Sequence, residues 1–489
     1  MLAEIKKEFS THRWVYLISI LFIVFNAIFM ANEVYWISGI PFILLTVYVA
    51  LKWLDKLILF IVFLTPFSVP LEYYYPELGF NLQLITEPLL ILVLIIFGYR
   101  ILLERKFDRE LLTHPVSWII YFQLVWLIIT SITSSMPLVS FKFLISRMWF
   151  LVAFYFIAMA MFQKRSMIRR YIWMYIPAML IVIIYTIINL SQSGLFNQKA
   201  AHLAASPFFR DHTSYGAILA MLIPVVAGLG MIKKYSLPFR ILTWIIFLVL
   251  CFAIIFSYTR AAWISLFVAL GVFVIVKLKI SFKLIGLLIL ISGSIVYAYR
   301  TDIFIKLEQN RQDSSKDIAK HIESISNIRT DASNLERINR WNSAFRMFHE
   351  RPVTGWGPGT YMFQYAPFQV SHEKTIISTN MGDWGNAHSE YIGPLAESGL
   401  LGLLGMVALV IASLYIGFRV YFSAEPFSHE RILSLALTLG LITYYIHGIL
   451  NNFLDTDKAS VLVWGYTAML VAMDVKRKRK KEPLTSEIQ

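Results

Sequence analysis

Long apolar runs, each bounded by charged or turn residues, constrain the fold of this chain more than any other feature. A bilayer core about 30 Å thick requires roughly 20 apolar residues per crossing helix, and about fourteen runs approach this length, although the third is short and interrupted by prolines. Only 15% of the residues are charged, whereas soluble domains contain about 25%. This excludes a water-soluble multidomain enzyme and predicts an all-α polytopic membrane protein. The expected spans are 14–31, 34–52, 57–70, 83–99, 114–134, 138–162, 171–190, 213–232, 239–257, 261–278, 283–299, 399–420, 431–451 and 459–474.

One run is too long for a single crossing. From Ile241 to Val276 the only charged residue is Arg260. A helix over the whole run would extend about 54 Å, so we expect the chain to fold back near Ser257–Arg260.

The positions of the cations predict the orientation of the chain. With a cytoplasmic N-terminus, short cytoplasmic segments contain 27 of the 44 Lys and Arg residues, and short outer loops contain four. Because positive residues are retained on the cytoplasmic side, this asymmetry supports an even number of spans and two cytoplasmic termini. Cytoplasmic anchoring in the bilayer thus accounts for much of the net charge of +14, so we expect membrane lipids as partners and no nucleic acid. The expected parts are membrane helices 1 to 11 over 1–299, a large periplasmic loop over 300–398, membrane helices 12 to 14 over 399–475, and a basic cytoplasmic tail over 476–489.

The large loop is predicted to be partly helical. Apolar residues at helical spacing indicate one helix, which ends before Pro352: Leu335, Ile338, Trp341, Phe345 and Phe348. Three glycines and a proline in Thr354–Gly359 then predict a tight turn.

Two arginines in short outer loops are candidates for binding an anion. Arg260 either marks a helix end as a snorkelling cation or presents its guanidinium to a lipid-linked phosphate, whose oxygens match that planar group. Arg210 either binds the same kind of anion or forms a local ion pair with Asp211.

The large loop adds a histidine and two more arginines. His388 lies where the loop returns to the membrane, and a histidine can accept a proton near neutral pH, as activation of a hydroxyl requires. Arg337 and Arg340 share one helix face, which is either a solvated face or part of a substrate site.

Lys142 lies inside the sixth predicted span, where an ionisable group is costly unless it has a partner or faces a cavity. It either extends an anionic-headgroup site into the membrane or pairs with Glu87. The carboxylates of Asp455 and Asp457 either bind a divalent cation or belong to a polar turn. The sequence contains no HExxH, GxSxG, Walker A or GxGxxG motif, so zinc hydrolysis, a serine triad of the elbow type and nucleotide hydrolysis have no support. With a single cysteine, Cys251, we expect no thiolate metal cluster.

Five segments together carry a family resemblance. In order, they are Ser257–Trp263 (SYTRAAW), Arg337–Trp341 (RINRW), Arg351–Gly359 (RPVTGWGPG), Asn386–Tyr391 (NAHSEY) and Glu397–Gly402 (ESGLLG). Their order and spacing, on a multispan chain with one large loop before the last spans, resemble the O-antigen ligase and O-antigen polymerase superfamily over about residues 140–420. The family often has Asn after the histidine, where this chain has Ser389.

The resemblance implies an inverting glycosyltransferase of the bacterial inner membrane that uses neither a metal nor a cofactor. The implied donor is a glycan linked to undecaprenyl diphosphate, and the acceptor hydroxyl lies on lipid A core or a comparable molecule at the periplasmic face, as in lipopolysaccharide biosynthesis. By position, His388 resembles the family's candidate base, and Arg260 and Arg337 resemble the arginines that hold the donor diphosphate, with Arg210 as a further match. The sequence leaves two alternatives open, namely a polymerase of polysaccharide repeat units and a non-enzymatic flippase of lipid-linked oligosaccharides.

Overall fold

The computed structural model describes residues 2–74, 83–103, 108–281, 294, 332–375, 378 and 385–481. Every named element among these residues is a helix, which confirms the all-α class. Except for residue 294, the predicted span 283–299 lies outside the described residues, as do 300–331 of the large loop and 482–489 of the tail. The chain divides into two compact units, Met1–Leu57 and Ile58–Gln489.

Eleven helical segments of the described residues are long and apolar enough to cross a membrane. The first unit contains α1 (Leu2–Ala31), the 3-10 helix η1 (Tyr35–Gly39) and α2 (Ile40–Lys52), which hold the first two of these segments. In the second unit the helices that hold the others are α4 (Thr86–Leu103), α6 (Pro115–Ile132), α7 (Pro137–Leu151) with η5 (Val152–Ile157) and α8 (Ala158–Met161), α9 (Arg165–Gln192), α11 (His212–Met231), α12 (Leu237–Phe256), α13 (Arg260–Leu278), α19 (Ile392–Ser423) and α21 (Asp457–Lys481).

Two predicted spans differ from these segments. The third, 57–70, corresponds to α3 (Leu54–Leu64), which has only 11 residues and is followed by a 3-10 turn, η2 (Thr65–Phe67). A proline in η2 cannot supply the N–H that the helix would need to continue. The span predicted at 431–451 corresponds to α20 (His429–His447), a 19-residue helix whose first turn contains polar and charged residues.

The long apolar run folds back where its length predicts. Helix α12 ends at Phe256 and α13 begins at Arg260, and Tyr258 between them has a φ of 50°. The predicted turn at Ser257–Arg260 is therefore confirmed.

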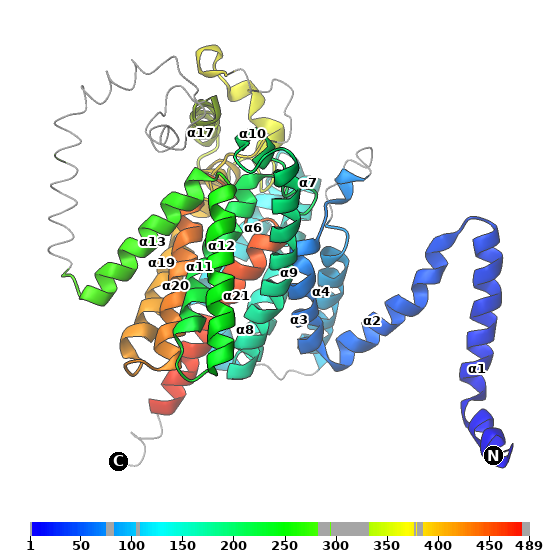
Figure 1. Cartoon of the computed structure of the whole chain (residues 1–489). Coiled ribbons are helices and arrows are strands. Elements are labelled where there is room, and N and C mark those ends of the chain that lie inside the picture. Colours follow the sequence, from blue (N-terminus) through cyan, green and yellow to red (C-terminus); the bar gives the residue numbers. More distant parts are fainter. Residues whose placement is uncertain are drawn as a thin grey trace. The chain divides into compact units, whose positions relative to one another are not determined.

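The helices of the second unit run side by side as a bundle (Figure 1). Small residues allow close helix contacts, as is usual in membranes. A Cβ on Gly228 of α11 would lie 2.5 Å from the Cβ of Ala436 in α20. Helix α21 occupies the core, where the side chains of Trp464 and Tyr466 are buried and the carbonyl of Val461 accepts a 2.8 Å hydrogen bond from the Tyr171 hydroxyl.

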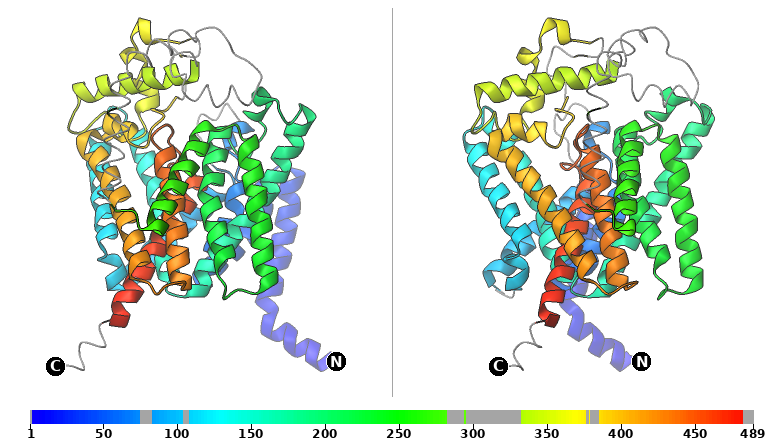
Figure 2. Two further views of the ribbon diagram at one scale, coloured as in Figure 1. Left: turned by 60° about the vertical axis from the view of Figure 1, so that its left-hand side comes forward. Right: turned by 90° about the vertical axis from the view of Figure 1, so that its left-hand side faces the viewer.

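One end of this bundle is covered by residues of the large loop. Figure 2 shows α17 (Ala332–Glu350) lying across that end, roughly perpendicular to the bundle helices. The helix predicted from the apolar spacing before Pro352 is thus confirmed. A turn and the short helix α18 (Tyr361–Gln364) lead from it towards α19.

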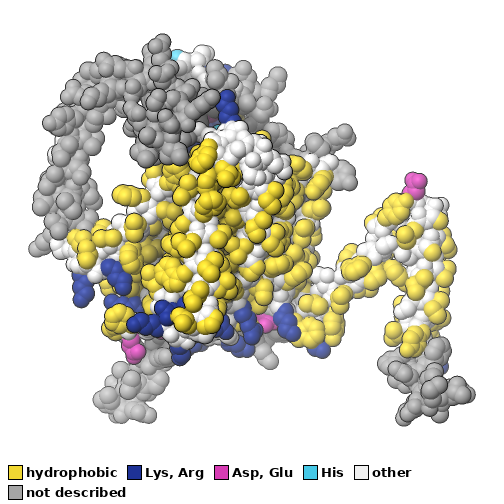
Figure 3. Space-filling model, in the orientation of Figure 1, with side chains coloured by type: hydrophobic (Ala, Val, Ile, Leu, Met, Phe, Trp, Pro, Cys, Tyr) yellow, Lys and Arg dark blue, Asp and Glu magenta, His cyan; other side chains and the backbone are white. Residues whose placement is uncertain are grey.

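Most of the Lys and Arg side chains on the face seen in Figure 3 gather at the opposite end of the bundle, where α11 ends and α12 begins. The surface between the two ends is largely apolar there, as contact with lipid tails requires.

Candidate functional site

The turn between α12 and α13 places Arg260 beside the start of α11. The hydroxyl of Thr259 donates a 2.7 Å hydrogen bond to the backbone carbonyl of His212. This close contact requires Gly216, because a Cβ there would lie 2.7 Å from the Cβ of Thr259. Arg260 consequently interacts electrostatically with the His212 ring.

The N-cap of α11 fixes a carboxylate near this turn. Asp211 Oδ1 accepts hydrogen bonds of 2.8 Å from the Ser214 N–H and of 2.8 Å from the Thr213 hydroxyl. Burial opposes ionisation, but these bonds outweigh it and lower the pKa of Asp211. The carboxylate therefore serves as a helix cap, while Arg210 is exposed and interacts electrostatically with Asp455.

Helix α17 supplies both predicted arginines, in different surroundings. Arg340 is buried, and its guanidinium donates to Glu336 Oε1 at 2.8 Å and to the Asn386 carbonyl at 3.2 Å. It also lies over the ring of Tyr365, 4.9 Å from the ring centroid. Arg340 thus ties α17 to the segment that carries His388.

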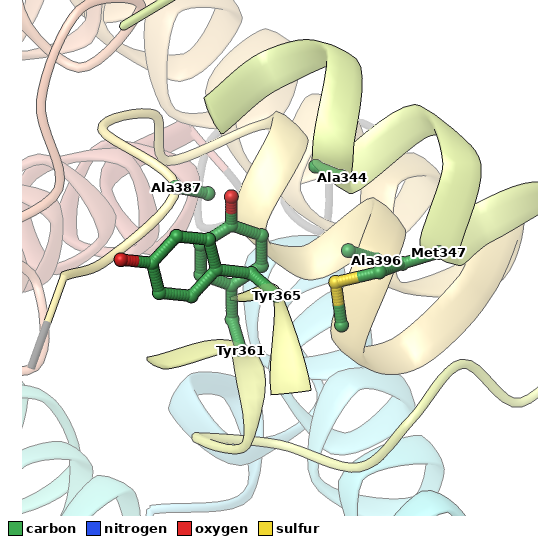
Figure 4. Packing of buried hydrophobic residues seen from close by; sticks show 6 residues of the cluster. All are labelled: Ala344, Met347, Tyr361, Tyr365, Ala387 and Ala396. Atoms are coloured by element: carbon green, nitrogen blue, oxygen red, sulfur yellow. The ribbon is translucent and has the colours of Figure 1, made fainter. Parts of the chain in front are cut away.

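An apolar cluster holds the same segment from the other side. It consists of Ala344, Met347, Tyr361, Tyr365, Ala387 and Ala396 (Figure 4). The rings of Tyr361 and Tyr365 stack with centroids 5.3 Å apart, and the Tyr361 hydroxyl donates to the Arg340 carbonyl at 2.7 Å. Because Ala387 is one of its members, the cluster fixes the backbone directly before His388.

His388 adopts a left-handed backbone conformation, with a φ of 48°. Its N–H donates to Asn386 Oδ1 at 3.0 Å, closing a local turn. Burial, followed by the positive charges of Arg340 and Arg337, lowers the pKa of His388 to about 3, against a weaker opposite effect of Asp211. The imidazole is therefore neutral at physiological pH.

Three histidines from different parts of the chain lie within electrostatic range of Arg337. Arg337 interacts electrostatically with His388, with His212 at the start of α11 and with His447 at the end of α20. We call Arg260, Arg337, His212, His388 and His447 the arginine–histidine site. The sequence indicated Arg260, Arg337 and His388, whereas His212 and His447 were missed because neither belongs to a recognisable motif.

Lys142 belongs to a different polar group, with Glu87 and the two residues that begin α21. Asp457 Oδ2 accepts from the hydroxyls of Ser68 at 2.5 Å and Thr86 at 2.7 Å, and Lys458 Nζ donates to the Ser68 carbonyl at 2.9 Å. The Asp455 and Asp457 carboxylates thus have separate partners, as in a polar turn. In the part of the chain that the structure describes, no group of three or more His, Cys, Asp or Glu residues could hold a metal ion.

The glycine-rich motifs have a structural explanation. Gly399 interrupts α19 with a φ of 67° and a ψ of −165°, and the Leu400 N–H donates to the Pro352 carbonyl at 3.0 Å. The Gly357 N–H donates to the Glu397 carbonyl at 2.8 Å. These bonds dock the turn after α17 onto the start of α19.

Glu390, two residues after His388, is a buried hydrogen-bond acceptor. Its Oε1 accepts from the Tyr444 hydroxyl at 2.5 Å and from the backbone N–H groups of Phe453 at 2.6 Å and Leu454 at 2.8 Å. Burial raises the pKa of this carboxyl above its usual value. Glu390 thereby joins the His388 segment to the end of α20.

Fold and site together define a polytopic membrane protein with an arginine–histidine site where an extramembrane helix caps its helical bundle. A family model described as O-antigen ligase matches residues 245–407. The matched region contains Arg260, Arg337, Arg340 and His388, and over these residues the chain is similar to the O-antigen ligase family, which confirms the resemblance predicted from the motifs. The family indicates a glycosyl-transferring membrane enzyme that acts on lipid-linked glycans. No curated protein matches the chain.

Proposed function

We propose that the protein transfers a glycan from an undecaprenyl-diphosphate carrier to an acceptor hydroxyl, on lipid A core or a comparable acceptor, without a metal or cofactor. The observation that carries the proposal is the electrostatic interaction of Arg337 with both His388 and His212, three side chains from separate parts of the chain. A guanidinium beside a neutral imidazole combines an anion binder with a proton acceptor.

Arg337 and Arg260 would hold the diphosphate of the donor. As the bond between the anomeric carbon and the phosphate oxygen breaks, negative charge develops on the leaving diphosphate. Guanidinium groups that are already in place stabilise that charge without reorganisation. Arg210 and Lys142, which have other partners, remain predictions for outer contacts with the donor or its headgroup region, and Arg340 is assigned to holding the His388 segment.

His388 would accept the proton of the acceptor hydroxyl while that oxygen attacks the anomeric carbon. With a pKa of about 3, the imidazole is a weak base before the donor binds. A diphosphate on Arg337 would offset the positive field that lowers this pKa and make the imidazole more basic. The proposal thus implies that the donor binds before the acceptor is activated.

The proposed location is the bacterial inner membrane, with both termini in the cytoplasm and the arginine–histidine site on the periplasmic face. The gathering of Lys and Arg at the end of the bundle opposite α17 supports this orientation, since positive residues are retained on the cytoplasmic side.

Transfer of a lipid-linked glycan by the purified protein in nanodiscs tests the function. His388→Ala should lower the rate by about 10²–10⁴-fold, the usual contribution of a general base, while binding of undecaprenyl diphosphate is retained. His349→Ala, an exposed histidine of α17, is the matched control and should remain fully active. Full activity of His388→Ala would refute the assignment of the base.

Two variants test the binding of the diphosphate. Arg337→Ala and Arg260→Ala should weaken binding of undecaprenyl diphosphate, because each removes a cation from the site. Arg346→Ala is the matched control on α17, since Arg346 pairs with Glu373 at 2.7 Å. Unchanged binding in both test variants would contradict the proposed site.

Deletion of the gene separates ligation from polymerisation, which use the same donor chemistry. Accumulation of full-length glycan on the carrier would indicate a ligase, and accumulation of single repeat units would indicate a polymerase. A flippase would instead leave its substrate on the cytoplasmic side of the membrane.

A further inference from the structure

His447, the last residue of α20, has one ring nitrogen in a hydrogen bond and the other buried without one among the described residues. Its side chain is buried, and its Nε2 lies 3.1 Å from the side-chain amide nitrogen of Asn451. Its other ring nitrogen, Nδ1, is buried without a hydrogen-bond partner among the described residues.

The contact with Asn451 determines which nitrogen of the ring carries the proton. An amide nitrogen can only donate, so Nε2 of His447 accepts the hydrogen bond. In a neutral imidazole the proton then resides on Nδ1. His447 therefore has a buried N–H donor at Nδ1, and the described protein provides no acceptor for it.

This ring lies in the arginine–histidine site. It interacts electrostatically with Arg337, Asp211 and His212. The end of α20 is also bonded to the segment after His388, since the Glu390 N–H donates to the Gly448 carbonyl at 2.8 Å.

The neighbours of the ring indicate what kind of group the Nδ1–H binds. Arg337 makes the surroundings positive, which favours an anionic oxygen. The Asp211 carboxylate already caps α11, and its Oδ1 accepts from Ser214 and Thr213. An anionic acceptor supplied by the substrate would satisfy this donor, which has no partner among the described residues and whose burial would otherwise destabilise the protein.

We propose that His447 donates its Nδ1–H to a phosphate oxygen of the lipid-linked donor, and that Asn451 sets the tautomer that makes this possible. The inference rests on the proposed function and adds a third group to the two arginines that hold the diphosphate. His447 is thus a binding residue for the leaving group, and Asn451 is a positioning residue that acts through it.

Two amide replacements of His447 separate this role from a purely structural one. The amide nitrogen of Asn can occupy the position of Nδ1 and still donate, whereas the amide of Gln reaches the position of Nε2 and can only preserve the contact with Asn451. We expect His447→Asn to bind undecaprenyl diphosphate within about threefold of the wild type. His447→Gln should bind it at least about tenfold more weakly, as loss of a hydrogen bond to a charged group predicts. The reverse order would overturn the proposal.

A change at Asn451 tests the tautomer while the ring stays in place. The carboxylate of Asn451→Asp can only accept, so the proton would move to Nε2 and leave Nδ1 as an acceptor. This variant should also lose at least about tenfold in affinity for undecaprenyl diphosphate. Unchanged affinity would overturn the assignment of the tautomer.

The affinity for undecaprenyl diphosphate is measured in nanodiscs for the full-length wild type, for the His447 and Asn451 variants, and for Arg337→Ala as a reference. If Arg337→Ala binds as the wild type does, the proposed diphosphate site itself fails. If Arg337→Ala binds weakly while His447→Gln and Asn451→Asp bind normally, the site stands and only the role of His447 is refuted. Thermal unfolding of each variant distinguishes a loss of folding from a loss of binding.

Discussion

Replacement of Gly399 by alanine tests the docking of the turn after α17 onto α19. The φ of 67° and ψ of −165° at this residue lie in a region that is essentially restricted to glycine and costs other residues about 1–3 kcal/mol. An alanine Cβ would lie 2.0 Å from the Val353 carbonyl oxygen. The resulting displacement would break the hydrogen bond from Leu400 to Pro352, at a net cost of about 0.5–1.5 kcal/mol. We therefore expect Gly399→Ala to lower the free energy of unfolding by about 2–4 kcal/mol.

Thermal unfolding of the detergent-solubilised protein measures this effect. In a domain of 150–250 residues 1 kcal/mol changes Tm by roughly 2–4 °C, and in a longer chain by less, so we expect a decrease on the order of 5 °C. Gly271→Ala in α13 is the matched control, because nothing lies within 4 Å of the added Cβ. Its Tm should equal or slightly exceed that of the wild type, since alanine favours a helix. Equal Tm values for the two variants would refute the docking geometry.

Three further predictions concern the pH dependence of the rate, the position of Arg260 and the buried contact between Ser68 and Lys458. Since the pKa of His388 is lowered to about 3 before the donor binds, its neutral form persists under acidic conditions, and kcat/KM for the donor should show no acid limb near the ordinary histidine pKa of about 6.5. An acid limb near pH 6.5 that disappears with His388 would contradict this environment. Gly216→Ala should displace the turn that carries Arg260 and weaken donor binding, as a titration with undecaprenyl diphosphate would measure; an unchanged affinity would contradict the contact. Ser68→Ala should remove the hydroxyl that contacts Lys458 and lower the free energy of unfolding by about 1–3 kcal/mol, and an unchanged Tm would show that this contact contributes little.

Most of the membrane fold could be predicted from the sequence because a helix in lipid must satisfy its own backbone hydrogen bonds. Apolar runs therefore reveal the helices, and the excessive length of the run from Ile241 to Val276 reveals the turn within it. Prolines also indicate the break after α3, but they do not show how far the helix continues, because apolar residues extend through the 3-10 turn at Thr65–Phe67. The contact partners of each helix depend on packing between distant segments and have no local signal.

The candidate site was predicted only where its residues lie in motifs. Arg260, Arg337 and His388 stand out as polar residues in recognisable surroundings, but His212 and His447 are each a single histidine at the end of an apolar run. Their relation to Arg337 arises from the three-dimensional fold. The one local indication at His447 is the polar residue Asn451, which lies four residues later and beyond the end of α20.

The position of α21 affects how the protein is made. This helix follows the other described helices in the sequence, yet its side chains are among the most deeply buried in the bundle, including Trp464 and Tyr466. The earlier helices therefore enter the membrane before the helix that they surround is available, and the surfaces that later enclose α21 must be covered by lipid or by the insertion machinery until α21 has been synthesised. A chain terminated before Asp457 would lack the centre of its bundle, and cellular quality control should remove it even though the residues of the arginine–histidine site would all be present.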